Sequence, residues 1–270
     1  MMPTIQKQRI IEYLKEGKRF DGRQPEEFRD ITVEMGLSKN AESSCSVKFG
    51  KTEVYVGVKL EVTEPYPDSP NKGNFMCSAE LSPLASESFE LGPPGINAIE
   101  LGRVLDRGIR ESGFIDFEKL CIKEGEKVWQ VFLDIIAIND DGNLMDVAGL
   151  AGLIALAHAK LPVYNEETGK PEHELSDIDL PLNKEAMAFN MTIHSINGVL
   201  IVDPSVDEEE LSDFRISMAI ADNNGEPRIT AMQKGKETAI TEGEMEKILK
   251  LVEDKHKEMF PKISKLVWGK

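Results

Sequence analysis

Residues 146–160 constrain the fold more than any other stretch of this 270-residue chain. The run DVAGLAGLIALAHAK predicts a helix that carries small residues at Ala148, Gly149, Ala151, Gly152 and Ala155. Small side chains let the backbone of a helix approach neighbouring elements closely, and a helix of this composition is typical of a protein interior. We therefore expect this helix to be buried at the centre of the fold.

Strand patterns lie on both sides of that helix. Residues 127–138 predict a mostly buried strand, and an earlier hairpin turns near Gly50–Lys51. After the helix, two further hairpins turn at Asn197–Gly198 and at residues 223–225, where Asn-Gly pairs favour tight turns. Each half of the chain thus runs from hairpins to a helix, which predicts an α+β fold with two related lobes.

The ends of the chain and its longest polar stretches have their own signals. Residues 3–17 predict an amphipathic helix, and Thr241 with Glu244 forms a capping box for a final helix that ends near Met259. Prolines and polar residues predict an exposed loop at 61–79 and a second loop, between the lobes, at 164–181.

The composition limits the kinds of partner. The net charge is −16, which argues against indiscriminate nucleic-acid binding and requires any anion site to be local or shared with a partner. Cys45, Cys77 and Cys121 lack CxxC spacing, so they signal neither a disulfide framework nor a zinc site. The sequence has no signal-type segment and no apolar run of about 18 residues. We expect a cytoplasmic protein without membrane contacts.

A helix predicted before the 127–138 strand carries an unusual arrangement of arginines. At about 100° per residue, Arg103, Arg107 and Arg110 fall within about 60° of one another, opposite an apolar stripe. The arrangement predicts three guanidinium groups on one outward face. The alternative is a solvated face whose arginines pair with the neighbouring acids Glu100, Asp106 and Glu111.

Acidic residues gather around the turn between the 127–138 strand and the buried helix. Asp134, Asp140, Asp141 and Asp146 could hold Mg²⁺ in a metal-dependent phosphoryl enzyme. Asp-Asp-Gly-Asn is also good turn chemistry, and acids are favoured at helix N-termini. We prefer this second interpretation and predict no metal site.

Two short motifs near the N-terminus carry a resemblance to a known family. Arg19-Phe20-Asp21-Gly22-Arg23, followed by Arg29-Asp30-Ile31, resembles the opening signature of the RNase PH family. The similarity continues through the arginine helix, the LDIIAINDDGN turn and the AMQKG run near residue 231. It implies two similar βα lobes, the first like domain 2 of ribosomal protein S5. The domains implied are an N-terminal helix (1–18), a first domain (19–183) and a second domain (184–270).

Within the family, the chain resembles the archaeal exosome subunit that pairs with the catalytic subunit. The resemblance implies a hexameric ring of three heterodimers that degrades RNA from its 3′ end, with inorganic phosphate as co-substrate of the complex. The implied partners are the catalytic RNase PH-like subunit, RNA-binding cap subunits and single-stranded RNA. Neither DNA nor a membrane is an expected partner.

One departure from the family pattern predicts that this chain has no catalytic residues and binds no cofactor. Active members follow the Asp-Gly turn with a Gly-Thr/Ser-Arg type run that holds phosphate. Here Asn143-Leu144-Met145 follows Gly142, which offers no cation, and Asp146 adds a negative charge. Active members also carry aspartates before a strand of the second lobe, and Asp213 lies near that register.

The resemblance assigns the arginine helix to RNA, because the matching helix of the family lines the path to the active site. It implies RNA contacts by Arg103, Arg107 and Arg110, to which we add Lys72 of the predicted 61–79 loop. The chain is then a non-catalytic subunit that positions the RNA 3′ end and completes the active site of its partner. Two alternatives remain: a self-sufficient phosphorolytic nuclease that uses Asp213, and a purely structural ring subunit.

Overall fold

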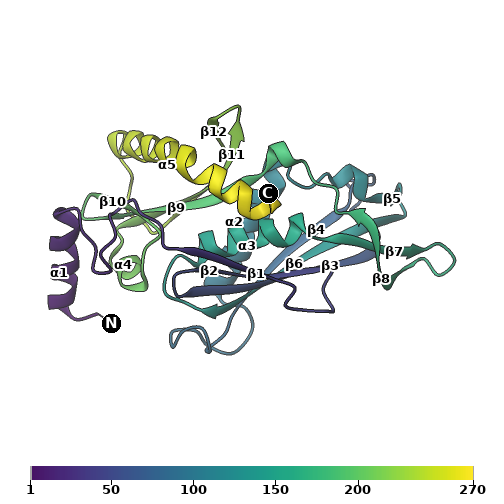
Figure 1. The fold of residues 1–270 in the computed structure, drawn as a ribbon, viewed down its shortest axis with the longest axis horizontal. Helices are drawn as coiled ribbons and strands as arrows, with labels where there is room; N and C mark the ends of the chain where they lie inside the picture. Colours follow the sequence, from purple (N-terminus) through teal and green to yellow (C-terminus); the bar gives the residue numbers. More distant parts are fainter. Residues whose placement is uncertain (1, 270) are drawn as a thin grey trace.

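The computed structural model describes residues 2–269 and consists of two main sheets with helices between and outside them (Figure 1). The first sheet has the order β1-β2-β3-β6-β4, with β5 added beside β6. Neighbouring strands of this sheet are antiparallel, except that β4 runs parallel to β6. Its strands are β1 (Ile31–Met35), β2 (Ser43–Phe49), β3 (Thr52–Thr63), β4 (Asn74–Leu81), β5 (Cys121–Lys123) and β6 (Lys127–Asn139).

The second main sheet has the order β10-β9-β11-β12, and all its neighbours are antiparallel. Its strands are β9 (Ala188–Ile196), β10 (Val199–Val202), β11 (Phe214–Asn223) and β12 (Glu226–Gly235). The turns at Asn197–Gly198 and Asn224–Gly225 have positive φ at both residues, as tight hairpin turns require. The predicted hairpins and the α+β fold with two βα lobes are confirmed.

The helices form layers with these sheets. The long helices α2 (Ile96–Ser112) and α3 (Leu144–Ala157) lie between the two sheets, and α5 (Glu242–Trp268) covers the outer face of the second (Figure 1). One continuous apolar core includes residues of both sheets and all three helices. The lobes are therefore two halves of one packed body.

The sequence of α3 explains its position between the sheets. Every residue from Asp146 to Leu156 is buried, which confirms the prediction of a central helix. A Cβ atom on Gly152 would lie 3.1 Å from Leu133 of β6, and one on Gly149 would lie 3.0 Å from Asn190 of β9. The two glycines thus allow α3 to approach both sheets at once.

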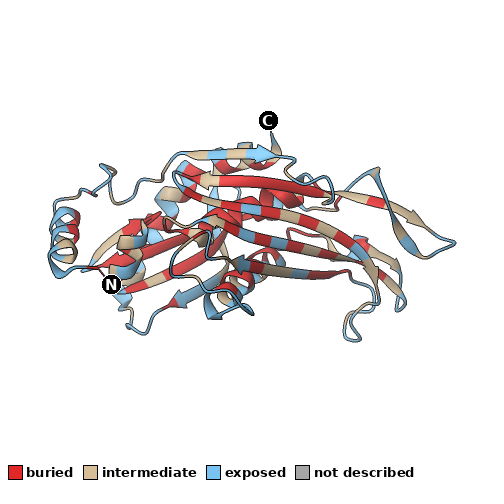
Figure 2. Ribbon diagram, turned by 90° about the horizontal axis from the view of Figure 1, so that it is seen from below, coloured by how far each residue is buried: buried red, intermediate tan, exposed pale blue. Residues whose placement is uncertain are grey.

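Burial along the long strands follows the expected period of two. In β6, Val131, Leu133 and Ile135 are buried against the helices, whereas Asp134 and Ile136 face outward. Figure 2 shows this alternation as bands of buried and exposed residues along the strands of the first sheet.

The N-terminal helix α1 (Thr4–Lys15) packs on the far end of the second sheet. Its Ile10 and Leu14 form a small apolar cluster with Ile196 and Ile201, separate from the main core. The short helix α4 (Val206–Leu211) lies beside it, and single 3₁₀ turns occur at Phe117–Leu120 and Lys184–Ala186. No helix within residues 2–269 has the length and apolarity needed to span a bilayer.

Three sequence-based predictions about loops and ends were wrong. The loop predicted at 61–79 occupies only 64–73, because Phe75 and Ala79 enter the core on β4. The stretch 164–181 is mostly hairpin, formed by β7 (Lys160–Asn165) and β8 (Lys170–Asp179), whose exposed residues hide the apolar signal of a strand. The last helix continues past Pro261 to Trp268, because Ile263 and Val267 are buried beyond the proline.

Candidate nucleic-acid interface

The arginine helix α2 is stopped at both ends by backbone geometry. It follows a Gly-Pro-Pro-Gly run and ends at Gly113, whose φ of 77° closes the helix. Its buried face includes Leu101, Leu105 and Ile109. Arg103, Arg107 and Arg110 are exposed on the other side, so the predicted orientation is confirmed.

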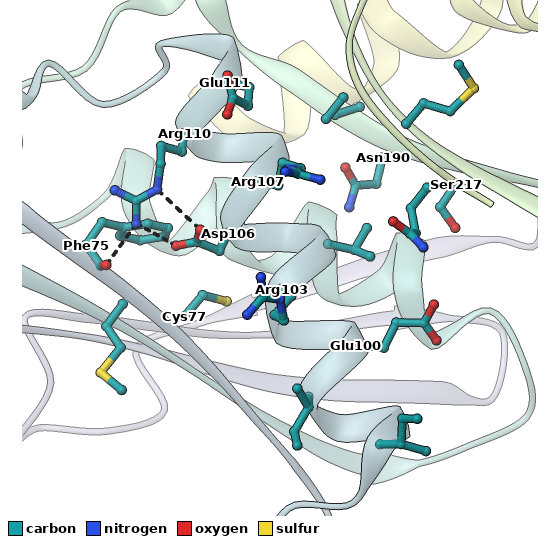
Figure 3. A pocket seen from close by; sticks show the side chains of 18 residues that line it. Phe75, Cys77, Glu100, Arg103, Asp106, Arg107, Arg110, Glu111, Asn190 and Ser217 are labelled. Carbon is teal, nitrogen blue, oxygen red and sulfur yellow. Dashed lines mark hydrogen bonds and ion pairs between the residues drawn. The ribbon is translucent and has the colours of Figure 1, made fainter. Parts of the chain in front are cut away.

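The exposed face of α2 lines an open groove of about 750 Å³ (Figure 3). One side of the groove is β4, with Phe75 and Met76. The other side is the second sheet, where three polar residues line it: Asn190 of β9, Ser217 of β11 and Gln233 of β12. The arginines therefore face a channel between the lobes.

The three arginines differ in their contacts. The guanidinium of Arg110 donates to the carboxylate of Asp106 at 2.8 Å and to the carbonyl of Phe75 at 3.0 Å. It also lies over the rings of Phe75 and Phe117, 5.7 and 5.6 Å from their centroids. The side chains of Arg103 and Arg107 make no hydrogen bond or ion pair with any residue from 2 to 269.

The predicted alternative of local ion pairs holds for one arginine of the three. Asp106 pairs with Arg110, but Glu100 pairs with Arg215 of β11 at 2.6 Å. This second pair joins α2 to the second sheet. The acids of the helix thus leave two guanidinium groups available to a ligand.

Lys72 is not among the residues that line the groove. It lies exposed in the 64–73 loop, two residues before β4 begins. Its backbone N–H donates a hydrogen bond to the Ser69 carbonyl at 3.2 Å.

The N-terminus of α3 is surrounded by carboxylates of this chain. The N–H of Asn143 donates to Glu209 at 2.8 Å, and its side-chain amide donates to Asp203 at 2.8 Å. The N–H of Gly142 donates to Asp140 at 3.0 Å. Helix N-termini attract anions, and here the anions are supplied internally.

Two arginines of the N-terminal segment stabilise the negative charge of Asp203. Arg29 donates to both of its carboxylate oxygens at 2.7 to 2.9 Å, and Arg23 donates at 2.9 Å. Burial opposes ionisation, but the hydrogen bonds and charge of Arg29 hold the pKa of Asp203 below its ordinary value. The guanidinium of Arg29 also donates to the carbonyls of Asp141 and Gly142, so its donors are committed.

Two other acids near this turn have no such arginine. Burial raises the pKa of Asp146 to about 7, although two hydrogen bonds from Thr192 at 2.7 and 3.0 Å partly offset it. Burial likewise raises the pKa of Glu209 to about 7. Both carboxyls are therefore held in conditions that disfavour their charged forms.

The four acids considered as a magnesium site do not converge. Asp134 lies on the outer face of the first sheet and accepts a hydrogen bond from Ser78, whereas Asp146 is buried against β9. The described residues contain no group of three or more His, Cys, Asp or Glu side chains that could hold a metal ion.

The signature arginines are structural, a role that sequence reasoning missed. Arg19 is buried and donates to Glu208 at 2.9 Å and to the carbonyl of Val202 at 3.0 Å. With Arg29, it joins the start of the chain to the second lobe. No local signal could reveal this, because the acceptors in the second lobe lie more than 170 residues away along the chain.

Asp213 lies exposed just before β11. Its carboxylate accepts the N–H of Asn197 at 2.7 Å, so it closes the β9–β10 turn.

Comparisons with known proteins match nearly the whole chain. Residues 27–162 match domain 1 of the 3′ exoribonuclease family, and residues 187–254 match domain 2. The chain is 46% identical over 236 residues to the exosome complex component Rrp42 of Thermococcus onnurineus, covering 87% of this chain and 85% of the relative. It is 42% identical to the protein of the same name from Methanocella arvoryzae, covering 94% of each.

Solved structures agree with the sequence relatives. A chain of the Archaeoglobus fulgidus exosome with RNA bound to the active site superposes with a TM-score of 0.86 at 38% identity, covering 96% of this chain and 97% of that one. A chain of an archaeal exosome core superposes with a TM-score of 0.81 at 35% identity, covering 96% of each.

Proposed function

Because the chain belongs to the 3′ exoribonuclease (RNase PH) family, we propose that it is the non-catalytic subunit of a phosphorolytic exosome ring. In this ring it positions the 3′ end of single-stranded RNA and completes the active site of a catalytic RNase PH-like partner. Cap subunits deliver RNA, inorganic phosphate is the co-substrate of the complex, and the complex works in the cytoplasm. The names of the relatives support the exosome assignment.

The observation that carries the non-catalytic role is the filled N-terminus of α3. A phosphate ion at this helix end would meet the carboxylates of Glu209, Asp203 and Asp140. The guanidinium of Arg29, which lies beside this helix end, is already committed to Asp203 and to backbone carbonyls. Phosphate binding and proton transfer are therefore assigned to the partner chain.

The groove along α2 supports the RNA-positioning role. Arg103 and Arg107 are exposed and have no partner within residues 2–269, so their charges are available for phosphates. Arg110 shapes the groove by holding Asp106 and the backbone of β4. On a chain of net charge −16, this local positive row can guide a strand while the rest of the surface repels it.

Lys72 is proposed as a contact outside the groove. The exposed loop that carries it leads into β4, whose Phe75 and Met76 line the groove. A lysine at this position contacts the RNA strand beside the groove rather than within it.

A first experiment tests RNA positioning against the purely structural alternative. In the ring assembled with its partner, the double variant Arg103→Ala/Arg107→Ala should flatten the dependence of log K on log salt by about 1.4, since each single-strand phosphate contributes about 0.7. The matched control is Arg9→Ala/Arg228→Ala, which removes two exposed charges outside the groove. Equal slopes in the two variants would favour a structural subunit.

A second experiment tests the self-sufficient nuclease. The purified chain, free of its partner, should release no nucleoside diphosphates from RNA in phosphate buffer. Release that disappears on Asp213→Asn would overturn the non-catalytic role. Such a result would have to account for a carboxylate that already accepts the N–H of Asn197.

A further inference from the structure

The second sheet forms the wall of the groove opposite β4. The arginines that position RNA do not belong to this wall. Asn190 lies on this wall, and its side-chain amide makes no hydrogen bond with any residue from 2 to 269. Its Nδ2 atom is buried without a partner. Most buried polar groups are satisfied, so an orphaned amide beside a groove calls for an explanation.

Two glycines leave room for the Asn190 amide. A Cβ atom on Gly108 of α2 would lie 3.2 Å from Oδ1, and one on Gly149 of α3 would lie 3.0 Å from Nδ2. The amide is thus packed between the two helices. Because the side-chain amide makes no hydrogen bond within residues 2–269, flipping it breaks none. The amide can therefore offer either its carbonyl or its amino group.

The neighbouring polar residues of this wall differ in availability. The hydroxyl of Ser217 is committed, since it accepts from Arg215 at 3.2 Å and lies 2.9 Å from the Thr192 hydroxyl. Gln233 is exposed, and the one hydrogen bond of its side chain within residues 2–269 is donated by Nε2 to the Lys234 carbonyl at 3.1 Å. Its side-chain carbonyl oxygen has no donor within residues 2–269.

The two walls of the groove therefore present different functional groups to one nucleic-acid strand. Figure 3 shows Asn190 and Ser217 on the opposite side of α2 from Arg110, with Arg107 between them. Guanidinium groups bind phosphates, which RNA and DNA share. Amides can donate and accept, as the ribose 2′-hydroxyl does, and this hydroxyl is present on every RNA nucleotide whatever its base.

We propose that Asn190 and Gln233 contact the ribose 2′-hydroxyl groups of the strand whose phosphates Arg103 and Arg107 hold, so that this groove selects RNA over DNA. The proposal rests on the proposed function, because it needs RNA in the groove. It adds to that function a contact that distinguishes the sugar without distinguishing the base.

The test compares binding of an oligoadenylate RNA and its 2′-deoxy counterpart to the assembled ring. Gln233→Ala, Asn190→Ala and the double variant should weaken RNA binding, by about tenfold for the double variant, if each amide supplies one ordinary hydrogen bond. Binding of the DNA should change less than twofold, and the salt slope for RNA should stay unchanged. Gln8→Ala, an exposed amide on α1, is the control. Gln233 is exposed, so its variant tests the proposal even if loss of the packed Asn190 side chain disturbs the fold.

The outcomes separate the two proposals. If the amide variants weaken RNA and DNA equally, or neither, while Arg103→Ala/Arg107→Ala still flattens the salt slope, the 2′-hydroxyl contact is wrong and the positioning role stands. If the arginine variant also leaves the slope unchanged, the proposed function itself fails.

Discussion

Two groups of arginines in this molecule have opposite surroundings. Arg19 and Arg29 are closed into the junction between the lobes, where carboxylates and backbone carbonyls accept their hydrogen bonds. Arg103 and Arg107 project from α2 into an open groove and contact no acceptor within residues 2–269. The comparison teaches that acceptors brought from elsewhere in the chain decide whether an arginine stabilises the fold or remains available to a ligand.

The largest expected effect comes from a substitution in the buried group, Arg19 and Arg29. Arg29→Met keeps an apolar stem but removes the charge, so Asp203 remains buried with Arg23 as its remaining cation. Loss of one partner from a buried pair costs about 3–5 kcal/mol. The free energy of unfolding in urea measures this, with exposed Arg9→Ala as the control. A loss below about 1 kcal/mol would show that the junction does not depend on this pair.

The next prediction compares two buried acids, Asp146 and Asp203. Burial raises the pKa of Asp146 to about 7 from an unfolded value near 3.8, so between these pH values the folded state holds a proton that the unfolded state has released. Stability therefore falls as pH rises through this window. Asp203 behaves oppositely, because its pKa is lowered and its contribution is lost only as pH falls below about 4.

The variant that tests this is Asp146→Asn, which cannot titrate. Its free energy of unfolding, measured from pH 5 to 8, should show a shallower decline than that of the parent, by at most about 1.4 kcal/mol per pH unit. Glu209 remains in both proteins and contributes in the same direction. Parallel curves for the two proteins would contradict the assignment.

A smaller effect is expected at Arg110, which is intermediate between the two groups. It is partly exposed, yet it holds Asp106 and lies over two aromatic rings. An i,i+4 pair and a cation–π contact at such a site together contribute about 1 kcal/mol. Arg110→Ala should lower the unfolding free energy by about that amount. A value equal to that of Arg103→Ala would remove the distinction between these arginines.

The smallest effect on stability is expected at the open group. Arg103→Ala and Arg107→Ala should each change the unfolding free energy by no more than about 0.5 kcal/mol, because neither side chain has a hydrogen-bond or ion-pair partner within residues 2–269 to lose. The same proteins, assembled with the partner, serve for the salt-slope measurement. A large loss of stability would mean that these guanidinium groups already have structural partners.

Sequence patterns predicted the parts of the fold that depend on neighbouring residues. The turn at Asn197–Gly198, the alternation in β6 and the small residues of α3 are local signals, and each appears as expected. The outward direction of the arginines also follows from helical spacing alone. The β7–β8 hairpin was missed because β8 is largely exposed and β7 is mostly half-buried, which removes the apolar period.

The arrangement of the candidate site could be predicted only in part. That Arg110 is held while Arg107 is not depends on the Phe75 carbonyl, which β4 brings to α2 through its parallel pairing with β6. The acids at the N-terminus of α3 come from Glu209 and Asp203, which lie about 60 residues further on. Such contacts arise from tertiary packing and leave no periodic trace in the sequence.

The position of α3 between the two sheets has a consequence for synthesis on the ribosome. When α3 has just been translated, the strands that cover its second face, β9 among them, have not yet been made, and Trp268, which packs against Phe114, comes last. At typical elongation rates the apolar face waits on the order of ten seconds. We expect stalled nascent chains ending before β9 to be cleaved readily by protease and to bind chaperones, whereas released full-length chains resist cleavage. Protease resistance of the shorter nascent chains would show that the first lobe folds without the second.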